Sequence, residues 1–258
     1  MSSSDKASEH CLYQEWMSLQ EQELSELLQK SLNKSNNNPE TITTTANDAD
    51  INELLNKIIK HFEDYADRRS CLIRRLNDPS AFFSPSWCTS FENSLLWVAG
   101  CRPSSYFSLV YALCGSDIES KLSEFFEDGS SSKFPHLSVS QLGSIDNLQR
   151  RIILEEEKLS TKVAMLQQDM VDMPLALVAR KSGPDHQFNS DAKDAISKIE
   201  QAMVAAIEEA DQLRVNTVKE LFTILTPIQA LEYIISAKKL RFCMQTWGLE
   251  RDRDHGRK

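Results

Sequence analysis

Hydrophobic residues recur three, four or seven positions apart along most of the chain, a spacing that places them on one face of an α-helix. Such stripes run through residues 12–28, 51–76, 142–170 and 196–224, and a further one runs from Leu231 toward Trp247. No stretch of any length alternates between apolar and polar residues as a half-buried strand would. The pattern predicts an all-α fold, a single-domain bundle of long amphipathic helices around one core.

Residues that favour helix ends predict where these helices begin and stop. In a capping box, a polar side chain caps the helix and a residue three positions later returns the hydrogen bond. Four such pairs mark helix starts: Asp50 with Glu53, Thr89 with Glu92, Ser138 with Gln141, and Thr226 with Gln229. Helix ends are expected at residues 77–79, at Gly100, at Gly115 and near Pro174.

The helical pattern is continuous enough to predict one domain, at residues 10–250. A flexible segment, 1–9, is expected before it, and a charged, frayed tail, 251–258, after it. Polar runs without residues to pack predict loops inside the domain, near residues 34–49, 129–137 and 181–190.

Composition and charge argue against several classes of protein. Seven glycines in 258 residues are few for a strand-rich fold or for phosphate-binding loops. The net charge of −9 argues against a free-standing nucleic-acid binder, because neutralising phosphates needs a basic surface. No stretch is apolar enough to span a membrane, and no membrane association is expected. A polar N-terminus and six scattered cysteines without a C-x-x-C pair predict reduced thiols in a cytosolic or nuclear protein.

Motifs of common catalytic sites are absent from the sequence. It contains no phosphate-binding or dinucleotide-binding glycine loop, no zinc-protease motif and no nucleophile elbow. The five histidines lie far apart, so their spacing predicts no metal site. We therefore expect no enzyme activity, no catalytic residue, no cofactor and no metal.

Three charged groups are interpreted first as solvated helix faces. Glu155, Glu156 and Glu157 are consecutive, so they point around a helix rather than toward one site. Arginines at positions 68, 69, 74 and 75 are expected to pair with Asp64 and Asp67. The alternative interpretation of these arginines is a docking patch for an acidic partner or a nuclear-import signal. The cations Lys238, Lys239 and Arg241 in the last helix admit the same two interpretations.

Residues 85–115 contain an unusual concentration of large and conformationally special residues. The most distinctive are Trp87, Glu92, Trp97, Gly100, Arg102 and Pro103. Two tryptophans and an Arg-Pro corner would fix a tight joint between helices, with Pro103 as the first residue of the second helix. Arg102 should meet a carboxylate, for which Glu92 is the candidate, or free carbonyls at a helix end. These residues favour a structural role.

The run Trp-x-x-Gly-x-Arg-Pro-Ser-Ser at residues 97–105 resembles the Delay of Germination family of plant seed proteins, whose domain is shared with TGA-type bZIP transcription factors. Further segments match in the expected order, at residues 13–20, 109–115, 155–158, 210–214, 225–227 and 247–248. The chain is similar to a stand-alone, dormancy-type member, because no basic region or leucine zipper precedes the domain.

The resemblance implies a non-enzymatic regulatory protein of seed dormancy or maturation in abscisic-acid signalling, acting as a protein-docking adaptor linked to transcription regulation. It implies a nuclear setting, with the cytoplasm left open, and partners among type 2C protein phosphatases or bZIP transcription factors. A homo-oligomer is also left open. Docking is expected at Tyr13, Glu15 and Trp16 on the first helix, since aromatic anchors dominate binding energy. The alternative for Trp16 is packing in the bundle core.

Two other functions are kept as alternatives: a sensor of haem or lipid inside the bundle, and a transcriptional regulator with sequence-specific DNA binding. The dormancy branch is associated with haem held by histidines one turn apart, and Arg241 and Gln245 occupy those positions here. Neither is a usual haem ligand, so no haem is expected. Cys243 and Met244 could ligate iron, but such residues more often belong to a core. The basic region by which TGA factors bind DNA is missing, so direct DNA binding is not expected without a partner.

Overall fold

The computed structural model describes residues 3–35, 44–76, 78–126, 136–169, 176 and 190–257. Within these ranges the regular structure is α-helical, and the only β feature is an isolated bridge between Trp97 and Gly100. The predicted all-α bundle is confirmed. None of the described helices is long and apolar enough to cross a membrane.

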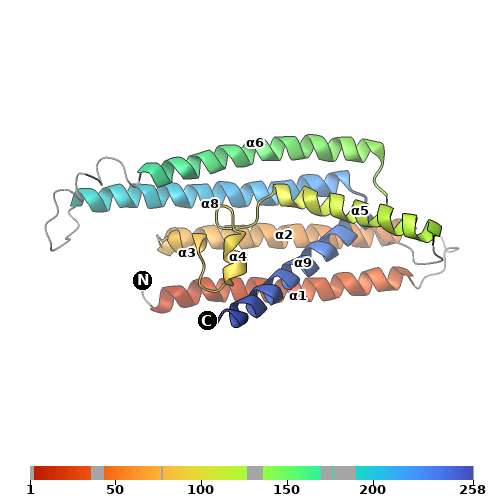
Figure 1. The fold of residues 1–258 in the computed structure, drawn as a ribbon, viewed down its shortest axis with the longest axis horizontal. Helices are drawn as coiled ribbons and strands as arrows, with labels where there is room; N and C mark the ends of the chain where they lie inside the picture. Colours follow the sequence, from red (N-terminus) through yellow and green to blue (C-terminus); the bar gives the residue numbers. More distant parts are fainter. Residues whose placement is uncertain are drawn as a thin grey trace.

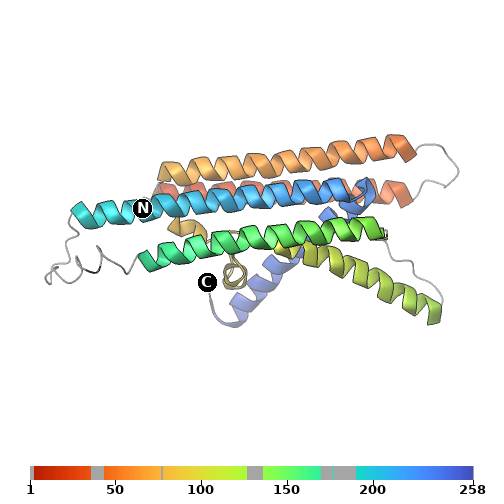
Figure 2. The same cartoon turned by 90° about the horizontal axis from the view of Figure 1, so that it is seen from above.

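Four long helices run alongside one another and shorter elements cover one side of them (Figure 1). The helices are α1 (Ser3–Ser35), α2 (Thr44–Leu76), α3 (Ser80–Phe83), α4 (Ser90–Ser94), α5 (Ser104–Phe126), α6 (Val139–Asp169), α8 (Ser190–Ile224) and α9 (Pro227–Asp254). Helix α6 packs against α8, α8 against α2, and α2 against α1. Helix α9 crosses α1 and α2 obliquely and also packs against α4 (Figures 1 and 2).

The main hydrophobic core lies where the long helices meet α5 and α9. Its fully buried side chains come from every one of these helices, namely Leu27, Ile58, Phe107, Ile145, Leu221 and Leu231. Each contributes about 1.5–3 kcal/mol relative to an exposed position. A smaller cluster, which includes Leu12, Ile73 and Phe82, packs beneath the α3 segment. The two clusters fix the positions of α1, α2 and α9, on which the candidate site depends.

Three of the four predicted capping boxes are confirmed, at Thr89, Ser138 and Thr226. Two of them are also joined to each other. The side-chain Nε2 of Gln141 donates to Gln229 Oε1 at 2.8 Å and to the carbonyl of Ile224 at 2.9 Å. The starts of α6 and α9 are thereby tied to the end of α8.

Other predicted boundaries differ from the structure. Helix α2 begins at Thr44, ahead of the Asp50 capping box, because no proline or glycine lies between them to interrupt it. Gly115 lies inside α5, where open space surrounds it and a helical glycine costs only about 1 kcal/mol. Helix α9 extends into the predicted tail as far as Asp254, because the Asp252 carboxylate accepts a hydrogen bond from the Ser90 amide at 2.9 Å.

The predicted N-terminal segment and loops are only partly described. Helix α1 begins at Ser3, within the segment expected to be flexible. Helix α1 extends to Ser35 and α2 begins at Thr44, so both cover part of the expected loop 34–49; residues 36–43 lie outside the described ranges. Pro174, residues 129–135 and residues 181–189 also lie outside them.

Candidate functional site

The Trp97–Gly100 segment forms a tight turn rather than the predicted end of a helix. Helix α4 already ends at Ser94, and Trp97 and Gly100 exchange two backbone hydrogen bonds, of 2.7 and 3.1 Å. The central residues Val98 and Ala99 have φ values of 42° and 59°, as in a type I′ turn. This backbone region is unfavourable for residues with side chains and costs about 1–3 kcal/mol for each. The surrounding structure must therefore hold the turn in place.

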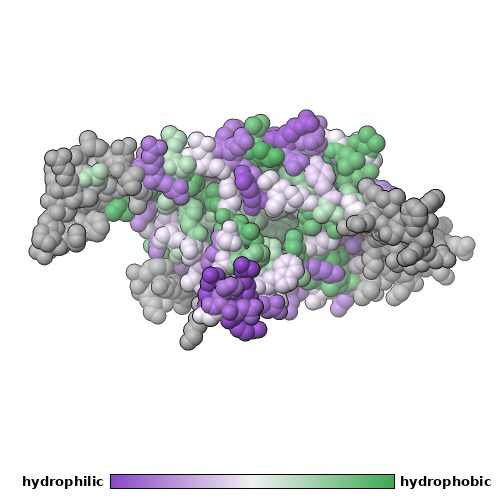
Figure 3. Space-filling model, in the orientation of Figure 1, coloured by the Kyte–Doolittle hydropathy of each residue, from purple (hydrophilic) through white to green (hydrophobic). Residues whose placement is uncertain are grey.

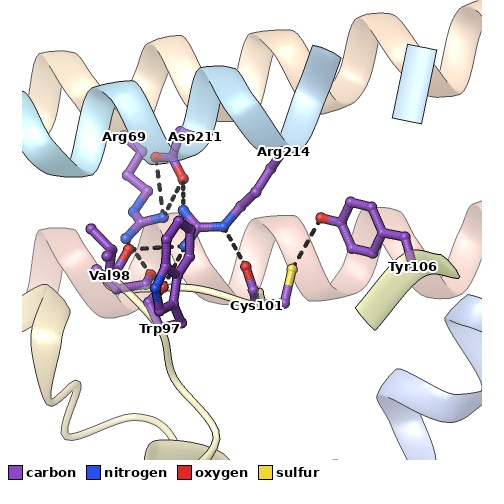
Figure 4. A network of polar contacts seen from close by, with 8 residues as sticks. Arg69, Trp97, Val98, Cys101, Tyr106, Asp211 and Arg214 are labelled. Carbon is purple, nitrogen blue, oxygen red and sulfur yellow. Dashed lines mark hydrogen bonds and ion pairs between the residues drawn. The ribbon is translucent and has the colours of Figure 1, made fainter. Parts of the chain in front are cut away.

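Two buried arginines from different helices bind the carbonyls of this turn (Figure 4). Arg69 of α2 donates to the Ala99 carbonyl at 2.5 Å. Arg214 of α8 donates to the carbonyls of residues 97, 98 and 101 at 2.5, 2.9 and 2.7 Å. Both guanidinium groups share the Asp211 carboxylate, at 3.0 and 2.6 Å. Buried charges are costly unless they are paired and hydrogen-bonded, and both conditions are met here.

Arg102 contacts Glu156 rather than the predicted Glu92. Its Nε donates to Glu156 Oε2 at 2.7 Å, and the Ser104 amide at the start of α5 donates to Oε1 at 2.5 Å. Glu156 is fully buried, so the expected solvated face at residues 155–157 is wrong for its middle residue. Pro103 immediately precedes α5 instead of forming its first residue, and the Ser104 amide at the start of that helix points to the Glu156 carboxylate.

Glu92 instead joins α4 to α9 and α1. Its Oε2 accepts hydrogen bonds from the Thr89 amide and hydroxyl at 2.9 and 2.8 Å, and its Oε1 accepts one from Arg241 at 2.5 Å. Burial disfavours the charged form, but the Thr89 amide and Arg241 outweigh it and hold the pKa of Glu92 below its usual value. Arg241 also donates to the Tyr13 hydroxyl at 2.7 Å, and the Tyr13 ring lies 6.4 Å from that of Trp87.

These contacts do not fit a haem held at the family's histidine positions in α9. The guanidinium of Arg241 is occupied by Glu92 and Tyr13, and Gln245 offers no ring nitrogen. Cys243 is exposed rather than part of the core. Among the described residues, no group of three or more histidine, cysteine, aspartate or glutamate side chains is placed to hold a metal ion.

A surface groove lies between α1 and α2, with a volume of about 390 Å³. We call it the α1–α2 groove; its lining residues are Glu15, Trp16, Leu19, His61, Asp64, Tyr65, Asp67 and Arg68. The Trp16 ring stacks on the Tyr65 ring with centroids 4.3 Å apart, and its centroid lies 5.2 Å from that of the Phe62 ring. Trp16 is half-buried: part of it packs against Phe62 and Tyr65 of α2, and part lines the groove.

The arginines of α2 do not pair with the aspartates of their own helix, contrary to expectation. Arg68 binds Glu15 at 2.5 Å, Arg69 binds Asp211, and Arg74 binds Glu208 with two contacts of 2.6 Å. The Arg68 hydrogen bond lowers the pKa of Glu15. These three arginines find carboxylates on neighbouring helices because α2 packs between α1 and α8.

As a result, two carboxylates of the groove, those of Asp64 and Asp67, have no arginine partner from α2. Asp64 and Asp67 are exposed, and neither forms an ion pair with any residue in the described part of the chain.

A buried ion pair lies beside this groove and joins three helices. Lys238 of α9 binds Glu23 of α1 at 2.5 Å and also donates to Gln20, and Glu23 contacts His61 Nδ1 of α2 at 2.5 Å. Lys238 is 4% exposed, so neither sequence interpretation of it, a solvated cation or a docking patch, is correct. Burial lowers the pKa of Lys238, and Glu23 opposes that effect.

The spacing of these charged residues along their helices indicates that they are buried, although the predictions from the sequence did not use it. Glu156 lies four residues after Ile152 and three before Leu159, on the buried stripe of α6. Lys238 follows Ile234 by four residues, and Asp211 follows Ile207 by four. A charge inside an apolar stripe indicates a buried partner on another helix.

Comparison with known proteins relates the chain to a family of plant proteins. A family model described as "DOG1: Seed dormancy control" matches residues 20–112. Protein DOG1-like 3 of Arabidopsis thaliana is 35% identical over 249 residues, covering 93% of this chain and 83% of that protein. Protein DOG1-like 1 of the same plant is 35% identical over 271 residues, covering 96% and 91%.

More distant similarity extends to two other kinds of Arabidopsis thaliana protein. Protein RESPONSE TO ABA AND SALT 1 is 28% identical, with 68% of this chain and 66% of that protein covered. Transcription factor TGA1 is 24% identical, with 78% of this chain but only 48% of that protein covered.

Proposed function

The chain belongs to the DOG1 seed-dormancy family, and we propose that it acts as a non-enzymatic adaptor that docks other proteins at the α1–α2 groove. The family consists of regulatory proteins related to TGA transcription factors rather than of known enzymes, and its members include a protein named for its response to abscisic acid and salt. The setting of the proposal is therefore the regulation of seed dormancy or maturation in abscisic-acid signalling.

The observation that carries the proposal is the partly exposed Trp16 beside the unpaired carboxylates of Asp64 and Asp67. The apolar side chains of Leu12, Met17 and Leu27 in α1 are buried, whereas Trp16 and Glu15 open onto the groove. Partly exposed aromatic residues in a concave surface are typical anchors of protein interfaces. This stretch of α1 is also the one in which the family resemblance implies partner docking.

Tyr13 has a different part in the proposal from its neighbours Glu15 and Trp16. Its hydroxyl accepts a hydrogen bond from Arg241 and its ring packs beside Trp87, so it orients α1 against α9 and the α3–α4 segment. Burial also raises the pKa of Tyr13, which keeps the hydroxyl neutral. Tyr13 thus positions the docking helix, while Trp16 and Glu15 are offered to the partner.

The proposed partners are type 2C protein phosphatases or bZIP transcription factors, met in the nucleus. The similarity to TGA1 supports a link with bZIP factors. Any effect on DNA would pass through such a partner, because the net charge of −9 disfavours direct contact with phosphates.

The test is a pull-down from maturing-seed nuclear extract with tagged wild type, Trp16→Ala and Trp247→Ala, read by mass spectrometry. Trp247 is a matched control because it is 53% exposed on α9, on a different element. We expect the wild type and Trp247→Ala to recover the same phosphatases or bZIP factors, and Trp16→Ala to recover at least fivefold less.

A second variant separates docking from folding. Trp16→Phe retains an aromatic ring against Tyr65 and should keep the melting temperature of the wild type while weakening recovery. Equal recovery by the wild type and both Trp16 variants would place docking elsewhere and contradict the proposal.

A further inference from the structure

We propose that the α1–α2 groove recognises a cationic side chain, arginine or lysine, presented by a protein partner and paired with Asp64 and Asp67 beside Trp16. The inference rests on the proposed function and adds the chemistry by which the partner is selected. It assigns a role to two residues for which the sequence pattern predicted only pairing with the arginines of their own helix.

The carboxylates are available because the packing of α2 diverts its own cations. Arg68 reaches across to α1 and binds Glu15, while Arg69 turns inward to Asp211. Asp64 and Asp67, three residues apart, are left on the exposed edge of the groove. Residues three apart on a helix lie on the same side, so one cationic group can reach both carboxylates.

The aromatic floor supplies the second element of cation recognition. Indole is the aromatic group that attracts cations most strongly, and Trp16 is held in one orientation by the Tyr65 stack and by Phe62. An anchored ring loses little entropy when a partner binds. The groove volume of about 390 Å³ is at the small end of ligand pockets, which suits one long side chain rather than a large cofactor.

The excess of negative charge in the groove also favours a positively charged partner. Three carboxylates, from Glu15, Asp64 and Asp67, line the groove. The basic groups are the Arg68 guanidinium, which Glu15 already neutralises, and the His61 ring, which contacts Glu23. The whole chain carries a further excess of negative charge, at −9. An acidic segment would be repelled, and a basic one would be attracted at long range before contact.

The first experiment uses a defined probe, so that it does not depend on identifying the partner. A short glycine peptide with one central arginine is titrated into the full-length, isotope-labelled protein, and the indole N–H signal of Trp16 is followed by nuclear magnetic resonance. Trp16→Phe assigns that signal among the four tryptophans. The matched probe is the same peptide with citrulline, which keeps the shape of arginine without its charge. We expect the arginine peptide to shift the Trp16 signal and the citrulline peptide to bind at least fivefold more weakly.

Variants test whether the two aspartates are responsible. Asp64→Asn with Asp67→Asn should weaken arginine-peptide binding at least fivefold. The control, Glu53→Gln with Glu157→Gln, removes the same charge from exposed positions outside the groove and should bind as the wild type does. Equal weakening by both pairs, or equal binding of both peptides, would overturn the proposal. Tighter binding of spermidine than of the arginine peptide would make the groove a small-molecule site and overturn it too.

The same variants distinguish this inference from the proposed function. If Trp16→Ala loses a partner in the pull-down while the aspartate pair retains it, the adaptor role stands and cation recognition fails. If the arginine peptide binds at Trp16 but no partner is recovered from extract, cation recognition stands and the adaptor role fails.

Discussion

Gly100 lies directly against the guanidinium group of Arg214: a Cβ atom at position 100 would stand 2.6 Å from Arg214 Cζ. The glycine of the family-like run Trp-x-x-Gly-x-Arg-Pro is therefore required by close approach and not by its own φ, since the left-handed residues of the turn are Val98 and Ala99. Arg214 has little freedom to move away, because it binds three carbonyls and Asp211.

Gly100→Ala should destabilise the protein by about 2–4 kcal/mol, because the added methyl displaces a guanidinium whose buried hydrogen bonds are then lost. Urea unfolding followed by circular dichroism measures the change. The control is Gly143→Ala in α6, where nothing lies within 4 Å of the added atom and a helical alanine should stabilise by about 0.5–1 kcal/mol. Similar effects of the two substitutions would contradict the packing argument.

Glu156→Gln should cost about 1–3 kcal/mol, whereas Glu155→Gln next to it should cost less than about 0.5 kcal/mol. Glu156 is fully buried and is the acceptor for Arg102 and Ser104, while Glu155 makes a solvent-exposed pair with Lys158. Free energies of unfolding from urea titrations give both values. If both substitutions proved equally mild, the carboxylate would not be what secures the start of α5.

Lys238→Met should destabilise by about 3–5 kcal/mol, because it leaves the Glu23 carboxylate buried without its lysine. Adding Glu23→Gln should recover a large part of that loss, since the uncompensated charge is removed. Lys239→Met is the neighbouring control at an exposed position and should change stability by less than about 0.5 kcal/mol. A double variant no more stable than Lys238→Met alone would show that packing, not charge, dominates at this joint.

Features that depend on neighbouring residues could be predicted from the sequence, whereas features that depend on contacts between distant residues could not. The capping boxes at Thr89 and Thr226 need only four consecutive residues, and both formed as predicted. The end of α9 was misplaced because Asp252 is held by Ser90, a contact between residues 162 positions apart. Figure 3 shows the result, a hydrophilic cluster over the C-terminal end of α9, where charged residues remain helical.

The candidate site shows the same division. The sequence drew attention to Glu15 and Trp16, which do share the groove, but the partners of Arg68 and Arg102 depend on helix packing. A pairing rule limited to one helix matched Arg68 with Asp64, four residues earlier, and missed Glu15 on α1. Interhelical competition for each cation decides which carboxylates stay unpaired, and that outcome cannot be obtained from spacing along a single helix.

The depressed pKa of Glu92 predicts an acid-sensitive joint between α4 and α9. A carboxyl group with a lower pKa in the folded chain than in the unfolded chain stabilises the fold above the unfolded value, about 4.3. That contribution should disappear as the pH falls below about 4.3 and through the folded value, because the unfolded chain takes up the proton first. Unfolding free energies measured from pH 6 to pH 3 should therefore fall more steeply for the wild type than for Glu92→Gln.

Glu92→Gln should already be less stable than the wild type at pH 6, because Arg241 loses its charged partner while remaining half-buried. The two curves should converge as the pH falls through the folded pKa of Glu92, because the wild-type carboxyl then becomes protonated as well. Glu250→Gln, a substitution at an exposed position of α9, the helix that carries Arg241, should follow the wild-type curve. Parallel curves for the wild type and Glu92→Gln over the whole range would show that Glu92 titrates alike in both states. The Thr89 and Arg241 contacts would then not favour its ionised form.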